Sequence, residues 1–312
     1  MGIYDSTIGT LLVGIFFNTY LYGLVTYQFA AYHRIKFNDH PAIKYMVLVL
    51  FILDTVHSIS AIYMAWVYCV TNYNNPTAIT SALWPYTFTP IATALAALLT
   101  QVFLGYRIYR LSNSRVLFGV ILVLAVPTFA LGMACGIRAW IIKVLVELSA
   151  LDSLVTGWLA MQVSLDLFIT VTLTIILTRS RTGFHKTDTV LNRLIRGAIQ
   201  TGLFAGIFSL GDLITFLRYP TTNLYGMFAI PIGRIYTNTL LDTLLARQDL
   251  RQQMAGTRDM DSDTNNGASW QSSSQRSKNI QLKEVEVRKD VQVFNDAASY
   301  EADLKVPSSM AI

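Results

Sequence analysis

The chain contains 312 residues, of which 53% are hydrophobic and only 14% are charged. Because soluble domains carry about 25% charged residues, this composition excludes an ordinary soluble domain and indicates a multi-pass protein of the lipid bilayer. The formal net charge of +5 comes mainly from loops between apolar runs, where it acts as an orientation signal. The charge therefore gives no reason to expect a nucleic-acid partner.

Seven apolar runs are long enough to cross a bilayer, which takes about 20 helical residues. We predict membrane-spanning helices at residues 8–32, 45–70, 84–106, 116–137, 153–178, 194–217 and 225–246. The predicted fold class is an all-α membrane protein, a seven-transmembrane helix bundle in residues 1–246. Between the fourth and fifth spans, the segment from Arg138 to Asp152 mixes Trp140, Lys143 and Glu147 with aliphatic residues, which favours a short interfacial helix.

The basic residues predict the orientation of the bundle. Eleven Lys and Arg residues lie in the loops after the first, third and fifth spans, against Arg138, Lys143 and Arg218 in the opposite loops. By the positive-inside rule, the N-terminus lies outside and the C-terminus lies in the cytosol. Whether the membrane is the plasma membrane or an endomembrane stays open.

Residues 247–312 form the predicted cytosolic tail. Residues 256–278 are rich in Ser, Asn and Asp and lack the apolar side chains of a core, so we expect the tail to be disordered. Valines partly alternate with charges between Ile280 and Val293. That pattern would suit strand addition to the sheet edge of a cytosolic partner, although a solvated tail that contains valines is the simpler interpretation.

Three polar side chains interrupt the last span: Arg234, Asn238 and Asp242. Their spacing of four residues places them along one stripe of a helix. An arginine at mid-span is costly unless it faces the bundle interior and finds a partner. Arg234 and Asp242 lie roughly 12 Å apart along one helix, so the partner is expected on another helix.

Four further ionisable residues lie within other spans: Asp54, His57, Asp166 and Asp212. Depth along the helices brings both Asp166 and Asp212 within reach of Arg234. Asp166 is the favoured partner because it lies deeper. Together with Asp242, the spans contain four acids and a single arginine. The acids that do not pair with Arg234 must be protonated, hydrated, hydrogen-bonded or paired with a cation.

These seven residues form the candidate site, either an intramembrane polar network that ties the helices together or a ligand or proton site. The leading hypothesis is a receptor-like protein that senses a small or lipophilic ligand in a cavity among the second, fifth, sixth and seventh helices. The alternatives are a proton- or cation-coupled carrier and a membrane adaptor whose polar stripes are structural. No inverted repeat is evident, which counts against a carrier.

The sequence predicts no enzyme, no catalytic residue, no cofactor and no metal site. His57 is the one histidine within a span and no HExxH motif occurs, so zinc chemistry is not expected. Arg234 occupies the helix where a retinal pigment needs a lysine, which excludes an opsin-like pigment. Cys69 and Cys135 both lie near outer span ends; two buried thiols are favoured over a disulfide.

The second half of the chain carries four recognisable motifs: LDLFIT around Asp166, RTGFHKTD, RLIRGAIQTG, and IPIGRIYTNTLLDTLLAR from Ile230 to Arg247. They resemble an uncharacterised family of seven-transmembrane proteins of mushroom-forming fungi, a domain of unknown function. The resemblance covers roughly residues 8–250, although Leu245 stands where the family usually has asparagine. It implies the fold and a fungal origin, and it implies no activity.

The outline also resembles G-protein-coupled receptors, which have seven helices and an outer N-terminus. The third span ends GYRIYR, without an acid before Arg107, and the last span lacks NPxxY. The receptor likeness is therefore one of architecture alone.

Overall fold

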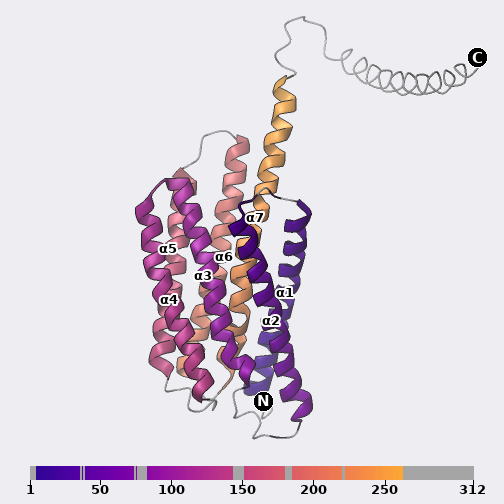
Figure 1. The fold of residues 1–312 in the computed structure, drawn as a ribbon, viewed down its shortest axis with the longest axis vertical. Coiled ribbons are helices and arrows are strands. Elements are labelled where there is room, and N and C mark those ends of the chain that lie inside the picture. The colour runs from indigo at the N-terminus through magenta and orange to yellow at the C-terminus, as the bar shows by residue number, and fades with distance from the viewer. Residues whose placement is uncertain are drawn as a thin grey trace, which may run out of the picture. The chain divides into compact units, whose positions relative to one another are not determined.

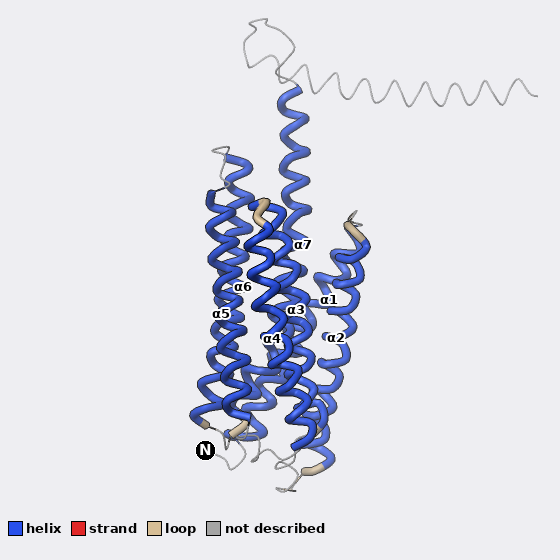
Figure 2. Tube along the Cα trace, turned by 60° about the vertical axis from the view of Figure 1, so that its left-hand side comes forward, coloured by secondary structure: helices blue, strands red, loops and turns tan. Residues whose placement is uncertain are grey.

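The computed structural model describes residues 5–35, 37, 39–73, 75, 83–142, 151–179, 185–219 and 222–262. Within these residues the regular structure is helical: η1 Asp5–Gly9, α1 Thr10–Ile35, α2 Pro41–Trp66, η2 Val67–Thr71, α3 Trp84–Ser112, α4 Arg115–Ile142, α5 Asp152–Arg179, α6 His185–Arg218 and α7 Leu224–Ser262. The chain divides into two units, Met1–Met254 and Ala255–Ile312, and the first contains the helix bundle (Figures 1 and 2).

The seven predicted spans correspond to α1 to α7, which confirms the all-α, seven-helix fold. Two helices extend furthest beyond their predicted bounds: α6 begins at His185 and α7 continues to Ser262. Residues 138–142 are the last residues of α4 and not a separate interfacial helix. Residues 247–262, predicted as the beginning of the disordered tail, are the last part of α7. Residues 143–150 and the tail from 263 onward lie outside the described residues, so the disorder and the partner predicted for the rest of the tail stay predictions.

Five helical segments in the described part of the chain are long and apolar enough to cross a membrane. They are Asp5–Ile35, Pro41–Thr71, Trp84–Ser112, Arg115–Ile142 and Asp152–Arg179. Large apolar side chains such as Phe16, Ile52 and Val123 are exposed on the outside of these helices, as expected for a surface that meets lipid. The chain is therefore a multi-pass helical membrane protein.

Local sequence explains several helix ends. Pro41 opens α2, where its missing N–H removes no helical hydrogen bond, and His40 Nδ1 accepts from the Ala42 N–H at 3.3 Å. At the other end of α3, Asn113 adopts a left-handed conformation with φ of 54°. Asparagine tolerates that conformation well, so it stops the helix and starts the tight turn into α4.

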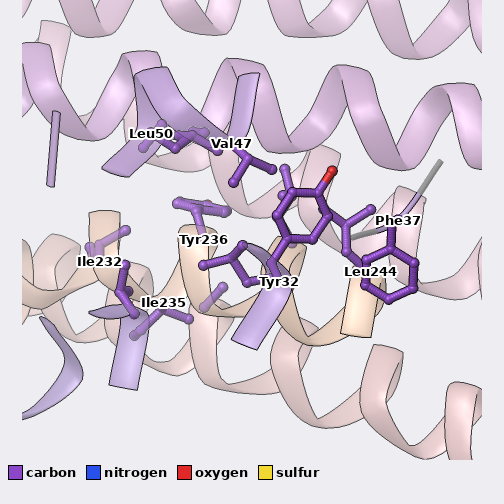
Figure 3. Close-up of a cluster of buried hydrophobic side chains, with 14 residues drawn as sticks. Tyr32, Phe37, Val47, Leu50, Ile232, Ile235, Tyr236 and Leu244 are labelled. Atoms are coloured by element: carbon purple, nitrogen blue, oxygen red, sulfur yellow. The ribbon is translucent and has the colours of Figure 1, made fainter. Parts of the chain in front are cut away.

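The core of the bundle surrounds α7. Every residue from Ile230 to Thr237 is buried, and such a run covers the whole circumference of a helix. Figure 3 shows Ile232, Ile235 and Tyr236 of α7 beside Val47 and Leu50 of α2, in a cluster that also includes side chains from α1, α3 and α6. Polar residues in this part of α7 must therefore find partners within the protein.

Candidate functional site

The buried arginine of α7 is paired with an acid of α2. Arg234 Nε lies 2.9 Å from Asp54 Oδ1, and the two side chains are 1% and 0% exposed. Arg234 Nη1 donates to the Asp54 backbone carbonyl at 3.0 Å and to Ser58 Oγ at 3.2 Å. Asn18 of α1 donates to the same Ser58 hydroxyl at 3.4 Å. The guanidinium therefore ties α7 to α2 and, through Ser58, to α1.

The sequence-based choice of partner for Arg234 was wrong. Asp166 was favoured and Asp212 was the alternative, but the ion pair forms with Asp54. Asp54 lies 13 residues into α2, or about 20 Å along the axis, so its depth also suits Arg234. Depth alone leaves several acids within reach, and the packing of α2 against α7 decides among them.

Asp166 of α5 is held by neutral side chains. Gln101 Nε2 of α3 donates to Oδ1 at 2.9 Å, Gln162 Nε2 donates to Oδ2 at 3.4 Å, and the Tyr236 hydroxyl of α7 donates to Oδ2. Gln162 also donates to the Tyr236 oxygen at 2.7 Å. This network connects α3, α5 and α7, and no cation takes part in it among the described residues.

The other two residues of the predicted polar stripe on α7, Asn238 and Asp242, are not deep in the bundle. Asn238 is partly buried and donates to the backbone carbonyl of Leu21 in α1 at 3.3 Å and to that of Arg234 at 2.8 Å. Asp242 is exposed and lies on the side of α6, since a Cβ on Gly197 would be 3.8 Å from its Oδ2. A step of four residues turns 40° around a helix, so the predicted stripe leaves the interior by Asp242.

His57 of α2 is fully buried beside the wall of a cavity. Its Nε2 lies 3.0 Å from Thr89 Oγ1, and that hydroxyl donates to the Pro85 carbonyl at 3.0 Å. The threonine oxygen can therefore accept the His57 Nε2–H. Within the described residues, no three His, Cys, Asp or Glu side chains lie close enough to hold a metal ion. His57 therefore holds the Thr89 side chain in place through this hydrogen bond.

A cavity of about 80 Å³ lies at the end of the bundle where α1 begins. This volume is several times what one water molecule requires. Side chains from α3 to α7 line the cavity, and most of its surface is apolar or aromatic. Asp212 of α6 is the one ionisable acid among the lining residues. Its side chain is 5% exposed, and it makes no hydrogen bond or ion pair through its carboxylate with any described residue.

A second, smaller cavity of about 40 Å³ adjoins the Asp166 network. Gln101, Asp166 and Tyr236 lie on its wall, together with Gly202 of α6. The second helix supplies no lining residue to either of these two cavities. The expectation that α2 lines a ligand cavity is therefore wrong for both, and Asp54 and His57 stand behind the walls.

Sequence reasoning missed the aromatic residues of the site. Tyr236, two residues after Arg234, points to the opposite side of α7 and meets Asp166. Trp158 of α5 lines the larger cavity and packs against Gly132 of α4, where an added Cβ would lie 2.7 Å from Trp158 Nε1. The 200° rotation between Arg234 and Tyr236 could have predicted that Tyr236 lies on the opposite side of α7. The Trp158–Gly132 contact could not be predicted in this way, because it depends on how two helices pack.

Both cysteines of the chain are free thiols. Cys135 is buried on the wall of the larger cavity and Cys69 is partly buried. Two buried thiols were favoured over a disulfide; Cys135 is buried as expected, whereas Cys69 is only partly buried.

At the opposite end of the bundle a second ion pair joins α7 to the connection between α1 and α2. Arg247 donates to both oxygens of Asp39 at 2.8 Å, and the Tyr32 hydroxyl donates to Asp39 Oδ2 at 2.9 Å. The Arg247 guanidinium also lies 5.1 Å from the centre of the Phe37 ring. This end is held by a bidentate pair, in contrast to the open cavity at the other end.

Part of the chain matches the model of a known protein family. Residues 162–249 match the model of a family of unknown function (DUF6534). No curated protein and no solved structure is detectably similar to the chain. The matched segment contains five of the seven candidate residues: Asp166, Asp212, Arg234, Asn238 and Asp242. Over part of its second half the chain is therefore similar to a family whose function is unknown.

Proposed function

We propose that this protein is a non-enzymatic membrane protein of receptor-like architecture that binds a small, largely lipophilic molecule in the cavity among α3 to α7. The observation that carries the proposal is the Asp212 carboxyl, which lines this cavity without a hydrogen-bond or ion-pair partner in the described part of the chain. The other buried acids have partners that account for them.

The partners of Asp54 and Asp166 explain why those acids are tolerated. Asp54 neutralises Arg234 and Asp166 accepts three side-chain donors, so both contribute to holding helices together. Asp212 ties no helix to another. A buried carboxyl without a partner costs several kcal/mol as an order of magnitude, and such a cost is usually accepted where a group has a function.

The position of the cavity along the bundle supports a ligand from the lipid or the outer aqueous phase. With the orientation predicted by the positive-inside rule, the end that carries the cavity faces outside, while the Arg247–Asp39 pair lies at the cytosolic end. We also propose that the protein is of fungal origin and that its resemblance to the family of unknown function extends to residues before 162. The membrane concerned, plasma membrane or endomembrane, is not part of it.

A carrier is the second candidate, favoured by one observation. The cavity beside Asp166 is lined by α3, α5, α6 and α7, which also line the larger cavity. Reconstitution into liposomes with a pH-sensitive dye tests this candidate. Proton flux that is abolished by Asp166→Asn would support a carrier. The absence of proton flux in liposomes that contain the folded protein would favour the receptor-like proposal. An adaptor role would rest on the tail, which lies outside the described residues.

Co-purification tests the leading proposal. The protein is extracted in a mild detergent, and bound small molecules are released and identified by mass spectrometry. Ala229→Trp fills the cavity from its α7 wall, and Val123→Trp adds the same side chain on an exposed lipid-facing position of α4. We expect a compound that co-purifies with the parent and with Val123→Trp and is lost from Ala229→Trp. Identical small-molecule profiles for all three proteins would contradict the proposal.

A further inference from the structure

We propose that the ligand of the cavity is an organic cation, an ammonium compound with an apolar body, and that Asp212 is its counter-ion. This inference rests on the proposed function, because it names the chemical class of the molecule that the same cavity binds.

The charge of the cavity favours a cation. Asp212 is acidic, and no Lys, Arg or His is among the residues that line the cavity. Arg234, the buried arginine of the neighbouring helix, is already paired with Asp54 at 2.9 Å. An anionic ligand would meet only a carboxylate, whereas a cation would supply the charge that the described residues do not provide.

The walls of the cavity favour an ammonium group over a small hydrated ion. Four aromatic side chains from four helices line it: Tyr86, Trp158, Phe216 and Tyr225. The Tyr225 ring stands edge-on to Phe216, with centroids 5.2 Å apart, and edge-on to Tyr86 at 5.9 Å. Aromatic faces attract alkylammonium groups through their quadrupoles. They supply few of the oxygen ligands that a metal cation needs.

The polar part of the wall is fixed in place. Thr89 lines the cavity and its hydroxyl donates to the Pro85 carbonyl, while its oxygen faces His57 Nε2 at 3.0 Å. The hydroxyl is therefore used within the protein and offers a ligand little further hydrogen bonding. The hydroxyls of Tyr86, Thr93 and Tyr225 also belong to lining residues, but they are neutral, so Asp212 is the one carboxyl group for recognition among the residues that line this cavity.

Three ligands with one body and different heads test the inference: 2-phenylethylammonium, 2-phenylethanol and 3-phenylpropanoate. Their binding to the purified full-length protein is measured by calorimetry or by the shift in melting temperature. We expect the cation to bind at least about tenfold more tightly than the alcohol, in line with the cost of leaving one member of a charge pair unmatched, and the carboxylate to bind more weakly than the alcohol.

Two neutralised variants separate the contribution of Asp212 from a general effect of charge. Asp212→Asn should lose the preference for the cation and should bind the cation and the alcohol with similar affinity. Alcohol binding then also shows that this variant is folded. Asp242→Asn removes an exposed acid outside the cavity and should keep the preference for the cation.

Several outcomes would overturn the inference. Equal binding of cation and alcohol, with both lost in Ala229→Trp, would contradict the cation class and leave the proposed function intact. A cation preference that survives in Asp212→Asn would remove Asp212 as the counter-ion. Binding of none of the three compounds would refute this ligand class, while the co-purification experiment judges the proposed function independently.

Discussion

Arg234 Nε of α7 lies 2.9 Å from Asp54 Oδ1 of α2, with both side chains almost completely buried. The pair joins the helix at the centre of the bundle to one of its neighbours. Arg234 divides its donors, since Nε faces the carboxylate and Nη1 binds the Asp54 carbonyl and Ser58. The pair is thus a structural connection between helices, separate from the cavity that contains Asp212.

Arg234→Ala should destabilise the protein sharply. The substitution leaves the Asp54 carboxylate buried without its cation, and breaking a buried pair typically costs ~3–5 kcal/mol in soluble interiors. Thermal unfolding in detergent should show a large fall in melting temperature. Adding Asp54→Asn should recover part of the loss, whereas adding Asp166→Asn or Asp212→Asn should change the melting temperature only as much as the same substitution does in the parent. A larger recovery from either of these two would mean that Arg234 has another partner.

Arg234→Lys should retain part of the stability that Arg234→Ala loses. An ammonium group can pair with the Asp54 carboxylate, but it lacks the planar set of donors that also reaches the Asp54 carbonyl and Ser58. We expect a melting temperature between those of the parent and Arg234→Ala. Arg218→Ala, at the exposed end of α6, is the control and should stay close to the parent.

Tyr236→Phe should weaken the connection between α5 and α7. The change removes the hydroxyl that donates to Asp166 and accepts from Gln162, and leaves buried polar atoms unpaired. Such a loss costs about 1–3 kcal/mol. Tyr219→Phe, on a side chain that is 55% exposed, should leave the melting temperature unchanged. Equal melting temperatures for both variants and the parent would show that the Tyr236 hydroxyl contributes no net stability.

Gly132→Ala should destabilise the protein by overpacking the contact of α4 with α3 and Trp158. A Cβ at this position would lie 2.6 Å from the Ala94 Cβ and 2.7 Å from Trp158 Nε1, so α3 or Trp158 must move. Overpacking of this kind costs typically about 1–3 kcal/mol. Gly119→Ala, on the same helix, meets nothing within 4 Å and should be neutral or slightly stabilising. If the two variants melted together, the close contact of α4 with Trp158 would be wrong.

The sequence was sufficient for the fold because the cost of polar groups in lipid is large. Seven apolar runs had to become helices. Asp54, His57 and Arg234 had to face the interior of the bundle because exposing their polar side chains to lipid is costly. The same argument misplaced Asp242, since it treated eight residues as one stripe although the helix turns about 80° over that distance.

The pairings depended on how helices pack, which a single sequence does not specify. Asp54, Asp166 and Asp212 all lie at depths that Arg234 can reach, and the choice of Asp54 follows from the position of α2 beside α7. Tyr236 and Gln101 were missed because an uncharged side chain in an apolar run gives no cost signal. The cavity itself is lined by residues from several helices, such as Trp158 of α5 and Asp212 of α6, and such an arrangement is not local in sequence.

The central claim is that the three buried acids differ in role: Asp54 and Asp166 hold helices together and Asp212 serves a ligand. Thermal unfolding of Asp54→Asn, Asp166→Asn and Asp212→Asn, measured side by side without added ligand, tests it most directly. We expect Asp54→Asn to lose the most stability, Asp166→Asn to lose less, and Asp212→Asn to match or exceed the parent, because the last change removes a costly unpaired group. A loss of stability in Asp212→Asn as large as that in Asp54→Asn would contradict the account.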